Sequence, residues 1–128
     1  MNLLQFHGEE TSEFCTQFCM MSVKALRVQN AESLNALENF QTDAFLLDAH
    51  SKAGLGGTGE KFKWDLAVAA QKFGKPIFLA GGLTPENVAD AVKQVRPFAV
   101  DVSSGVESAP GKKDAAKVRA FIEAVRKA

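Results

Sequence analysis

The sequence predicts an α/β fold in which strand–helix units follow one another and form a single parallel sheet. Five short runs are apolar at nearly every position: Leu3–Phe6, Val23–Val28, Ala44–Asp48, Pro76–Ala80 and Phe98–Val102. Strands that are covered on both faces have this continuous apolar pattern, which favours a parallel sheet. The runs begin at residues 3, 23, 44, 76 and 98, at intervals of 20, 21, 32 and 22 residues. Each interval is long enough for the helix that joins two parallel strands.

A helical pattern follows each run. Apolar residues recur at helical spacing in four of the five, as Phe14, Phe18 and Met21; Leu34, Leu37 and Phe40; Trp64 to Phe73; and Val118, Phe121, Ile122 and Val125. Asn30 and Asp114 are residues that cap helix starts, and Thr84 followed by Pro85 is the start signal of the remaining helix. Gly74 is suited to end the third helix. We therefore predict five strand–helix units in one domain, residues 1–128.

Composition and charge exclude several classes of protein. Lys plus Arg and Asp plus Glu both number 15, so the net charge of zero gives no support for binding to nucleic acid or to an anionic membrane. No apolar run approaches the roughly 20 residues of a membrane helix, and the first residues lack a signal-peptide pattern. Cys15 and Cys19 are four residues apart on the first predicted helix and form no metal-binding pair. These features predict a reducing, cytoplasmic setting.

Five units are compatible with two architectures. One is a complete doubly wound sheet of the flavodoxin type, and the other is part of an eight-unit TIM barrel, which needs roughly 200 residues. Both place their chemistry at the carboxyl ends of the strands. These ends carry Gln5 and His7, Arg27, Asp48, Gly81 and Gly82, and Asp101 with Ser103, Ser104 and Gly105.

The last two strand ends predict a phosphate site. LAGGLTPEN places two glycines before a helix start, and DVSSGVE places two serines and a glycine after the next strand. Glycines let backbone N–H groups approach an anion, hydroxyls donate further hydrogen bonds, and a helix N-terminus adds a favourable dipole. Ordinary tight turns are the alternative interpretation of the same residues.

Asp48 is a candidate general acid or base, because it ends a buried strand where partial desolvation raises the pKa of a carboxyl group. A loop or helix cap is the alternative. The segment Gly54 to Gly59 matches GxGxxG, but neither an apolar helix start nor a ribose-binding acid follows it, so we interpret it as a mobile loop over a site. His7 and His50 have no partner at metal-ligand spacing, and no cofactor is predicted.

Six segments in this order, QFHGEE, VKALRV, FLLDA, GGTGEKFKW, FLAGGLTPENV and FAVDVSSGVESAPGKKD, resemble phosphoribosylanthranilate isomerase over essentially the whole chain. The resemblance implies a TIM barrel that needs no cofactor. It also implies an Amadori rearrangement of N-(5-phosphoribosyl)anthranilate, with a phosphorylated small molecule as the ligand. Asp48 then corresponds to the general acid that protonates the furanose ring oxygen. Gly81, Gly82, Asp101, Ser103, Ser104 and Gly105 correspond to the phosphate site, and Gln5 and His7 line the pocket.

The chain also departs from this family. Lys63 stands where an aspartate is expected, and neither the KxCG strand with the basic cysteine nor the arginine for the anthranilate carboxylate occurs in the 128 residues. The sequence resembles the C-terminal five-eighths of the enzyme, so we expect an isolated chain without isomerase activity. We expect it to self-associate through its edge strands or to be complemented by the three missing units. A non-catalytic phosphate-binding half barrel and a signalling receiver domain are the alternatives.

Overall fold

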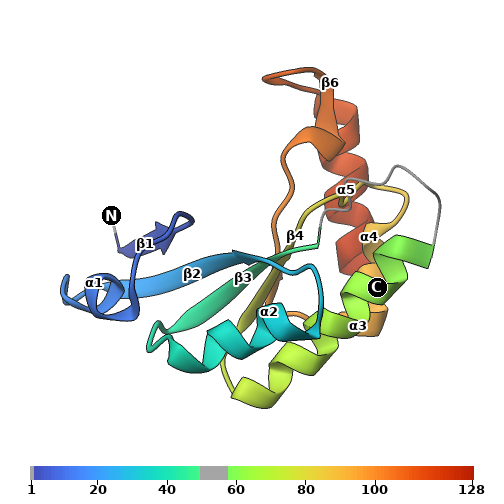
Figure 1. The fold of residues 1–128 in the computed structure, drawn as a ribbon. Coiled ribbons are helices and arrows are strands. Elements are labelled where there is room, and N and C mark those ends of the chain that lie inside the picture. The colour runs from blue at the N-terminus through green and yellow to red at the C-terminus, as the bar shows by residue number, and fades with distance from the viewer. Residues whose placement is uncertain (1, 50–57) are drawn as a thin grey trace.

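A computed structural model of the chain describes residues 2–49 and 58–128, and in the second range it describes side chains from Lys63 onward. Five parallel strands form one sheet: β1 (Leu3–Phe6), β2 (Met21–Arg27), β3 (Ala44–Asp48), β4 (Ile77–Ala80) and β5 (Ala99–Val100). They lie in the order β1-β2-β3-β4-β5 (Figure 1). A flavodoxin-like sheet has its first strand inside the sheet rather than at its edge. The flavodoxin alternative is therefore wrong, and the barrel-type arrangement is confirmed.

A helix follows each strand, as predicted, although two of the helices have other ends than expected. They are α1 (Ser12–Thr16), α2 (Ala31–Asn35) continued by the 3-10 turn η1 (Ala36–Asn39), α3 (Thr58–Ala70) continued by η2 (Gln71–Phe73), α4 (Val88–Val95) and α5 (Ala115–Lys127). Between β5 and α5 lie a 3-10 turn, η3 (Ser104–Val106), and an antiparallel hairpin, β6 (Glu107–Ala109) and β7 (Lys112–Lys113). The sequence did not predict this hairpin.

Three predicted helix ends are confirmed in their local chemistry. Asn30 accepts the N–H of Ser33 on its Oδ1 at 2.9 Å, and Ser33 Oγ accepts the N–H of Asn30 at 3.3 Å, which is a reciprocal capping box. Asp114 Oδ1 accepts the N–H groups of Ala116 and Lys117 at the start of α5. Gly74 follows η2 with φ of +69°, a conformation that favours glycine.

Two predicted helices begin or end elsewhere. The first helix stops at Thr16, because the chain turns through Cys19 with φ of +50° and Met21 already begins β2. Cys19 is thus exposed outside the helix, whereas Cys15 is buried within it. The fourth helix begins at Val88 rather than at Thr84. The intervening turn is held by Asn87, whose Oδ1 accepts the N–H of Thr84 at 2.8 Å.

The core lies mainly on one face of the sheet. Helices α2, α3, α4 and α5 cover that face (Figure 1), and the fully buried side chains of Phe45, Leu47, Leu79 and Val88 pack between them. The opposite face carries a smaller cluster formed by Val23, Ala44, Leu46 and Ala80. Successive strand residues point to opposite faces, so the alternation along β3 divides its side chains between the two clusters. The second face is the interior face of a barrel-type sheet.

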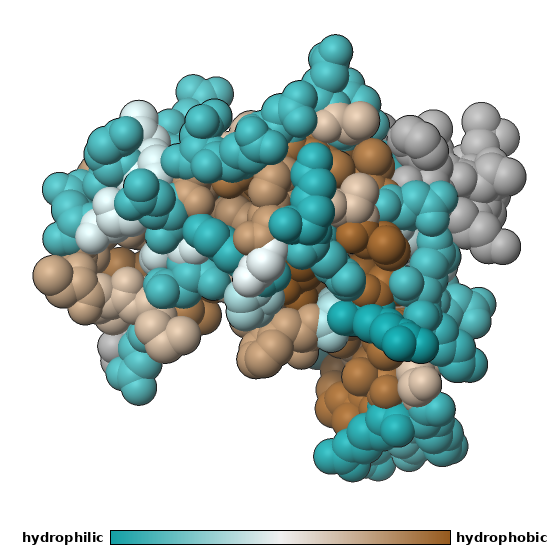
Figure 2. Space-filling model, turned by 90° about the horizontal axis from the view of Figure 1, so that it is seen from below, coloured by the Kyte–Doolittle hydropathy of each residue, from teal (hydrophilic) through white to brown (hydrophobic). Residues whose placement is uncertain are grey.

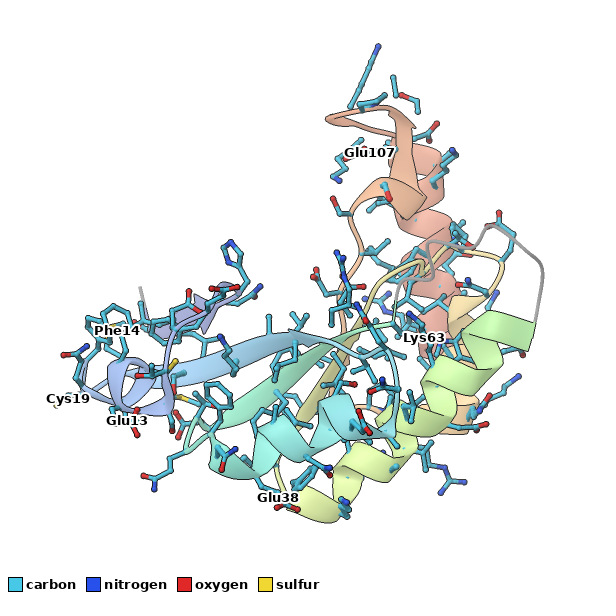
Figure 3. The ribbon with its side chains drawn as sticks, viewed as in Figure 1. Glu13, Phe14, Cys19, Glu38, Lys63 and Glu107 are labelled. Carbon is cyan, nitrogen blue, oxygen red and sulfur yellow. The ribbon has the colours of Figure 1, made fainter. Side chains whose placement is uncertain are left out.

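Both edges of the sheet expose large apolar side chains. Leu3 and Met21 are exposed at the β1 edge, where the ring of Phe18 stacks on that of Phe6 with centroids 5.8 Å apart. Phe14 and Cys19 lie at the same end of the molecule (Figure 3). At the other edge, the side chain of Phe98 is 74% exposed. Seen from below, hydrophobic residues reach the surface among hydrophilic ones (Figure 2). Among the described residues, no helix combines the length and apolarity needed to cross a membrane.

Candidate functional site

A cavity of about 610 Å³ opens at the carboxyl ends of the strands. All the predicted site residues line it: Gln5, His7, Asp48, Gly81, Gly82, Asp101, Ser103, Ser104 and Gly105. The strand registers account for this convergence, since they place Arg27 beside Asp48 and Asp48 beside Ala80 at one level of the sheet. Parallel strands therefore bring side chains from distant parts of the sequence to one edge.

The turn after β4 depends on its two glycines. Gly81 has φ of +86° and Gly82 has φ of +68°, both in the left-handed region where a side chain is strained. Asn87 Nδ2 donates to the carbonyl of Gly82 at 3.0 Å. This hydrogen bond within the turn helps to fix its backbone. Gly81 and Gly82 both line the cavity, so the cavity wall there is bare backbone.

The turns after β4 and β5 pack directly against each other at Gly105. A Cβ atom at this position would lie 1.8 Å from the carbonyl oxygen of Leu83 and 2.9 Å from its carbonyl carbon. Only glycine fits a contact this close. The two predicted phosphate-binding segments therefore form one continuous surface, with Ser103 and Ser104 on one side and Gly81 and Gly82 on the other.

The hairpin supports this surface through Lys113, which the prediction of site residues omitted. Lys113 Nζ donates to the carbonyl oxygen of Ser103 at 2.9 Å and to Glu107 Oε1 at 2.6 Å. Figure 3 shows Glu107 at the base of the hairpin. The hydrogen bond from Lys113 is the main reason why the pKa of Glu107 lies below its usual value of 4.5. Lys113 lies in the PGKKD segment of the resemblance, which is the signal that could have identified it.

Asp48 ends β3 with a half-buried carboxylate that lines the cavity. Arg27, at the end of the neighbouring strand, places its Nε 3.8 Å from Asp48 Oδ2 and also lines the cavity. A carboxyl group at this point can exchange a proton with a ligand, and the guanidinium can bind an anionic group of the ligand. Arg27 is predicted at a strand end from the sequence, but no role is predicted for it.

Other candidates lie away from the cavity or outside the described residues. Burial raises the pKa of the Cys15 thiol, which makes it a poor nucleophile. Most of the glycine-rich segment from Gly54 lies outside the described residues, and α3 already includes Thr58 and Lys63. Among the described side chains, in residues 2–49 and 63–128, no group of three His, Cys, Asp or Glu is arranged to hold a metal ion.

The whole chain is similar to one family of enzymes. The family model for N-(5'-phosphoribosyl)anthranilate (PRA) isomerase matches residues 1–124. The isomerase of Geobacter metallireducens is 55% identical over 122 residues, 95% of this chain and 60% of the relative. That of Trichlorobacter lovleyi is 50% identical over 128 residues, all of this chain and 62% of the relative. The chain thus spans about three fifths of the length of these relatives.

Solved structures of isomerases have the same fold. A crystal structure of monomers generated from the dimeric enzyme of Thermotoga maritima matches with a TM-score of 0.83 and 36% identity, over all of this chain and 62% of that one. A complex with reduced 1-(o-carboxyphenylamino)-1-deoxyribulose 5-phosphate matches with a TM-score of 0.79 and 37% identity, over all of this chain and 61% of that one.

Proposed function

The chain belongs to the N-(5'-phosphoribosyl)anthranilate isomerase family, and we propose that its cavity binds the phosphate of N-(5-phosphoribosyl)anthranilate and supplies the general acid for its rearrangement. The observation that supports this most strongly is the convergence of nine predicted residues on one cavity. A related isomerase has been solved with a reduced 1-deoxyribulose 5-phosphate compound bound, which is a ligand of the chemistry that we propose.

The turns after β4 and β5 are the proposed phosphate site. Backbone N–H groups near Gly81, Gly82 and Gly105 can approach phosphate oxygens closely because these residues carry no side chain. The hydroxyls of Ser103 and Ser104 add donors at the same place. The ammonium of Lys113 donates to the carbonyl oxygen of Ser103. This hydrogen bond holds the serine segment, so that its hydroxyl donors are in position before the ligand binds.

Asp48 is the proposed general acid. Its proton goes to the ring oxygen of the ribose as the bond between that oxygen and the first sugar carbon breaks, and the nitrogen lone pair forms the new C=N bond. A proton must then leave the second sugar carbon. In the family the cysteine of the KxCG strand accepts it, and that segment does not occur in these 128 residues.

We therefore propose that the 128-residue polypeptide taken alone binds the phosphate end but does not turn the substrate over. General-base catalysis contributes roughly 10²–10⁴-fold, and substrate orientation contributes more. The test is to mix the polypeptide with the first three strand–helix units of the Geobacter metallireducens relative. Turnover above a no-enzyme control in the mixture, and none with either part, is expected. Turnover by the polypeptide alone would contradict this proposal.

A non-catalytic phosphate-binding module is the second candidate, because the predicted phosphate-binding residues account for most of the cavity residues that the sequence singled out. Binding without any turnover in the mixture would favour it. The phosphate site itself is tested by titrating ribose 5-phosphate into isotopically labelled polypeptide. Ser104→Asp is expected to weaken binding by placing a negative charge in the site. Ala120→Asp is the control, since it adds the same charge at an exposed position of α5 that lies outside the cavity. Shifts confined to β1 and β2 would show that the site lies elsewhere.

A further inference from the structure

Lys24 is a buried lysine on β2 that the proposed function leaves unexplained. Its side chain is 3% exposed. The ammonium donates to the carbonyl oxygen of Gly8 at 2.8 Å, to Glu10 Oε2 at 2.8 Å and to the carbonyl oxygen of Glu10 at 3.5 Å. It also lies 5.1 Å from the ring centroid of Phe40. All the oxygens that it binds belong to the segment that follows β1.

This arrangement closes a ring of hydrogen bonds around Gly8. The carboxylate of Glu10 accepts the N–H of Gly8 at 2.9 and 3.2 Å, and the same carboxylate binds Lys24. Both backbone groups of Gly8 are therefore tied to Lys24, directly or through Glu10. The ion pair also lowers the pKa of Glu10, with the Lys24 hydrogen bond as the largest cause.

Stability alone is a poor reason for such a group. Removing an ammonium from water is costly, and well-packed apolar residues often replace a buried ion pair without loss of stability. The position of the hydrogen bonds between Lys24, Glu10 and Gly8 suggests another reason. Strand β1 has four residues and, among the described strands, pairs with β2, which carries Lys24. Directly before Gly8 lies His7, which lines the cavity.

We propose that Lys24 is a positioning residue for the β1 end of the cavity. It fixes Gly8, and with it His7, so that this end meets the part of the ligand beyond the phosphate. The inference rests on the proposed function, because it takes the phosphate to bind at β4 and β5. Three strand spacings separate β1 from β4, up to about 14 Å along the sheet. A phosphate ion therefore does not reach His7, whereas an extended sugar phosphate with an aromatic group does.

The test uses two probes on the 128-residue polypeptide: inorganic phosphate, and reduced 1-(o-carboxyphenylamino)-1-deoxyribulose 5-phosphate. Lys24→Met is expected to leave the affinity for phosphate unchanged. It is expected to lower the affinity for the sugar phosphate about tenfold, as when one hydrogen bond to a charged group is lost. The shift of the His7 imidazole signals on adding the sugar phosphate should also disappear. Lys24→Arg, which keeps the charge, should restore part of both.

Lys75→Met is the matched control. Lys75 Nζ also donates to backbone carbonyls, those of Phe40 at 2.8 Å and Thr42 at 2.6 Å, and lies 5.1 Å from the ring centroid of Phe45. Lys75 precedes β4 and therefore lies at the end of the sheet opposite the cavity. The affinities for phosphate and for the sugar phosphate should both stay unchanged in Lys75→Met. Glu10→Gln is a milder variant for use if Lys24→Met does not fold. It is also expected to lower the affinity for the sugar phosphate and to leave the affinity for phosphate unchanged.

The outcomes separate the two proposals. Equal losses for both probes, or unchanged affinity for the sugar phosphate, would overturn the positioning role. The positioning role is also overturned if the unchanged polypeptide binds phosphate at the β4 and β5 turns but binds the sugar phosphate no more tightly. In that case the proposed phosphate site is still supported. If the unchanged polypeptide binds neither probe, the proposed function itself fails.

Discussion

Gly105→Ala should disrupt the predicted phosphate site and the stability of the chain together. The added Cβ atom would lie 1.8 Å from the carbonyl oxygen of Leu83, and ordinary contact begins at 3.4 Å, so one of the two turns must retreat by 3.4 − 1.8 = 1.6 Å. The obstacle is a backbone atom rather than the end of a flexible side chain. The side chain of Leu83 is itself buried in the core, which limits its retreat.

The expected loss of stability follows from this geometry. Overpacking a rigid site costs about 1–3 kcal/mol and occasionally more. A displacement of this size against backbone belongs at the upper end, so we expect the free energy of unfolding to fall by about 3 kcal/mol. That is a large part of the roughly 5–15 kcal/mol that stabilises a typical domain. For a chain of this length the midpoint of thermal unfolding should fall by roughly 10 °C.

Thermal unfolding and a phosphate titration test this prediction together. Gly74→Ala is the control, because Gly74 has φ of +69° and nothing within 4 Å of its added Cβ. It should cost about 1–2 kcal/mol through backbone strain alone and leave phosphate binding unchanged. If Gly105→Ala is no less stable than Gly74→Ala and binds phosphate as the unchanged chain does, the close packing of the two turns is refuted.

Three further outcomes are expected. Asp48→Asn, in the mixture that restores turnover, should lower turnover at least about 10²-fold while the melting temperature changes little; loss of stability with unchanged turnover would favour a capping role. Glu107 has a lowered pKa, so its ion pair with Lys113 contributes stability above the ordinary value of 4.5, and this is lost as pH falls through the lowered pKa. The Ser103 amide signal should shift over that range and stay constant in Glu107→Gln; a shift that persists in Glu107→Gln would rule out this ion pair as its cause. Phe98→Lys should reduce concentration-dependent light scattering by discouraging association at the β5 edge, and equal scattering by both proteins would argue against that edge.

The sequence predicted the sheet, and with it the convergence of the candidate site residues on one cavity, because both follow from rules that act locally. A buried parallel strand is a continuous apolar run, and β3 is found at the predicted bounds, Ala44–Asp48. Once the strands are parallel and sequential, their carboxyl ends must meet. Residues as distant as Gln5 and Ser104 therefore line one cavity without any pairing signal between them.

The features that were missed depend on tertiary contacts. The hairpin strands hold three and two residues, mostly polar, and are held together by side chains such as Ser108, whose Oγ donates to the Lys112 carbonyl at 3.3 Å. The helical spacing of Phe14, Phe18 and Met21 predicts a longer first helix than the structure has. Phe18 instead packs against Phe6 from a turn, and Met21 enters the sheet. A period of apolar residues does not distinguish these cases.

The two ends of the cavity differ in how they are built, and this difference has a consequence for binding. The β4 and β5 turns are shaped mainly by glycine backbone and by direct packing at Gly105, and the ion pair of Lys113 with Glu107 supports them at Ser103. The β1 end is shaped by an ion pair, since the buried Lys24 binds Glu10 and Gly8 there. An ion pair of this kind is weakened when the carboxylate is protonated, whereas backbone packing is not. In the Glu107→Gln background, which removes the acid-sensitive ion pair next to Ser103, titrations of both probes should show affinity for the extended sugar phosphate falling as pH drops through the lowered pKa of Glu10, while affinity for inorganic phosphate stays constant. An equal fall for both probes would contradict this difference.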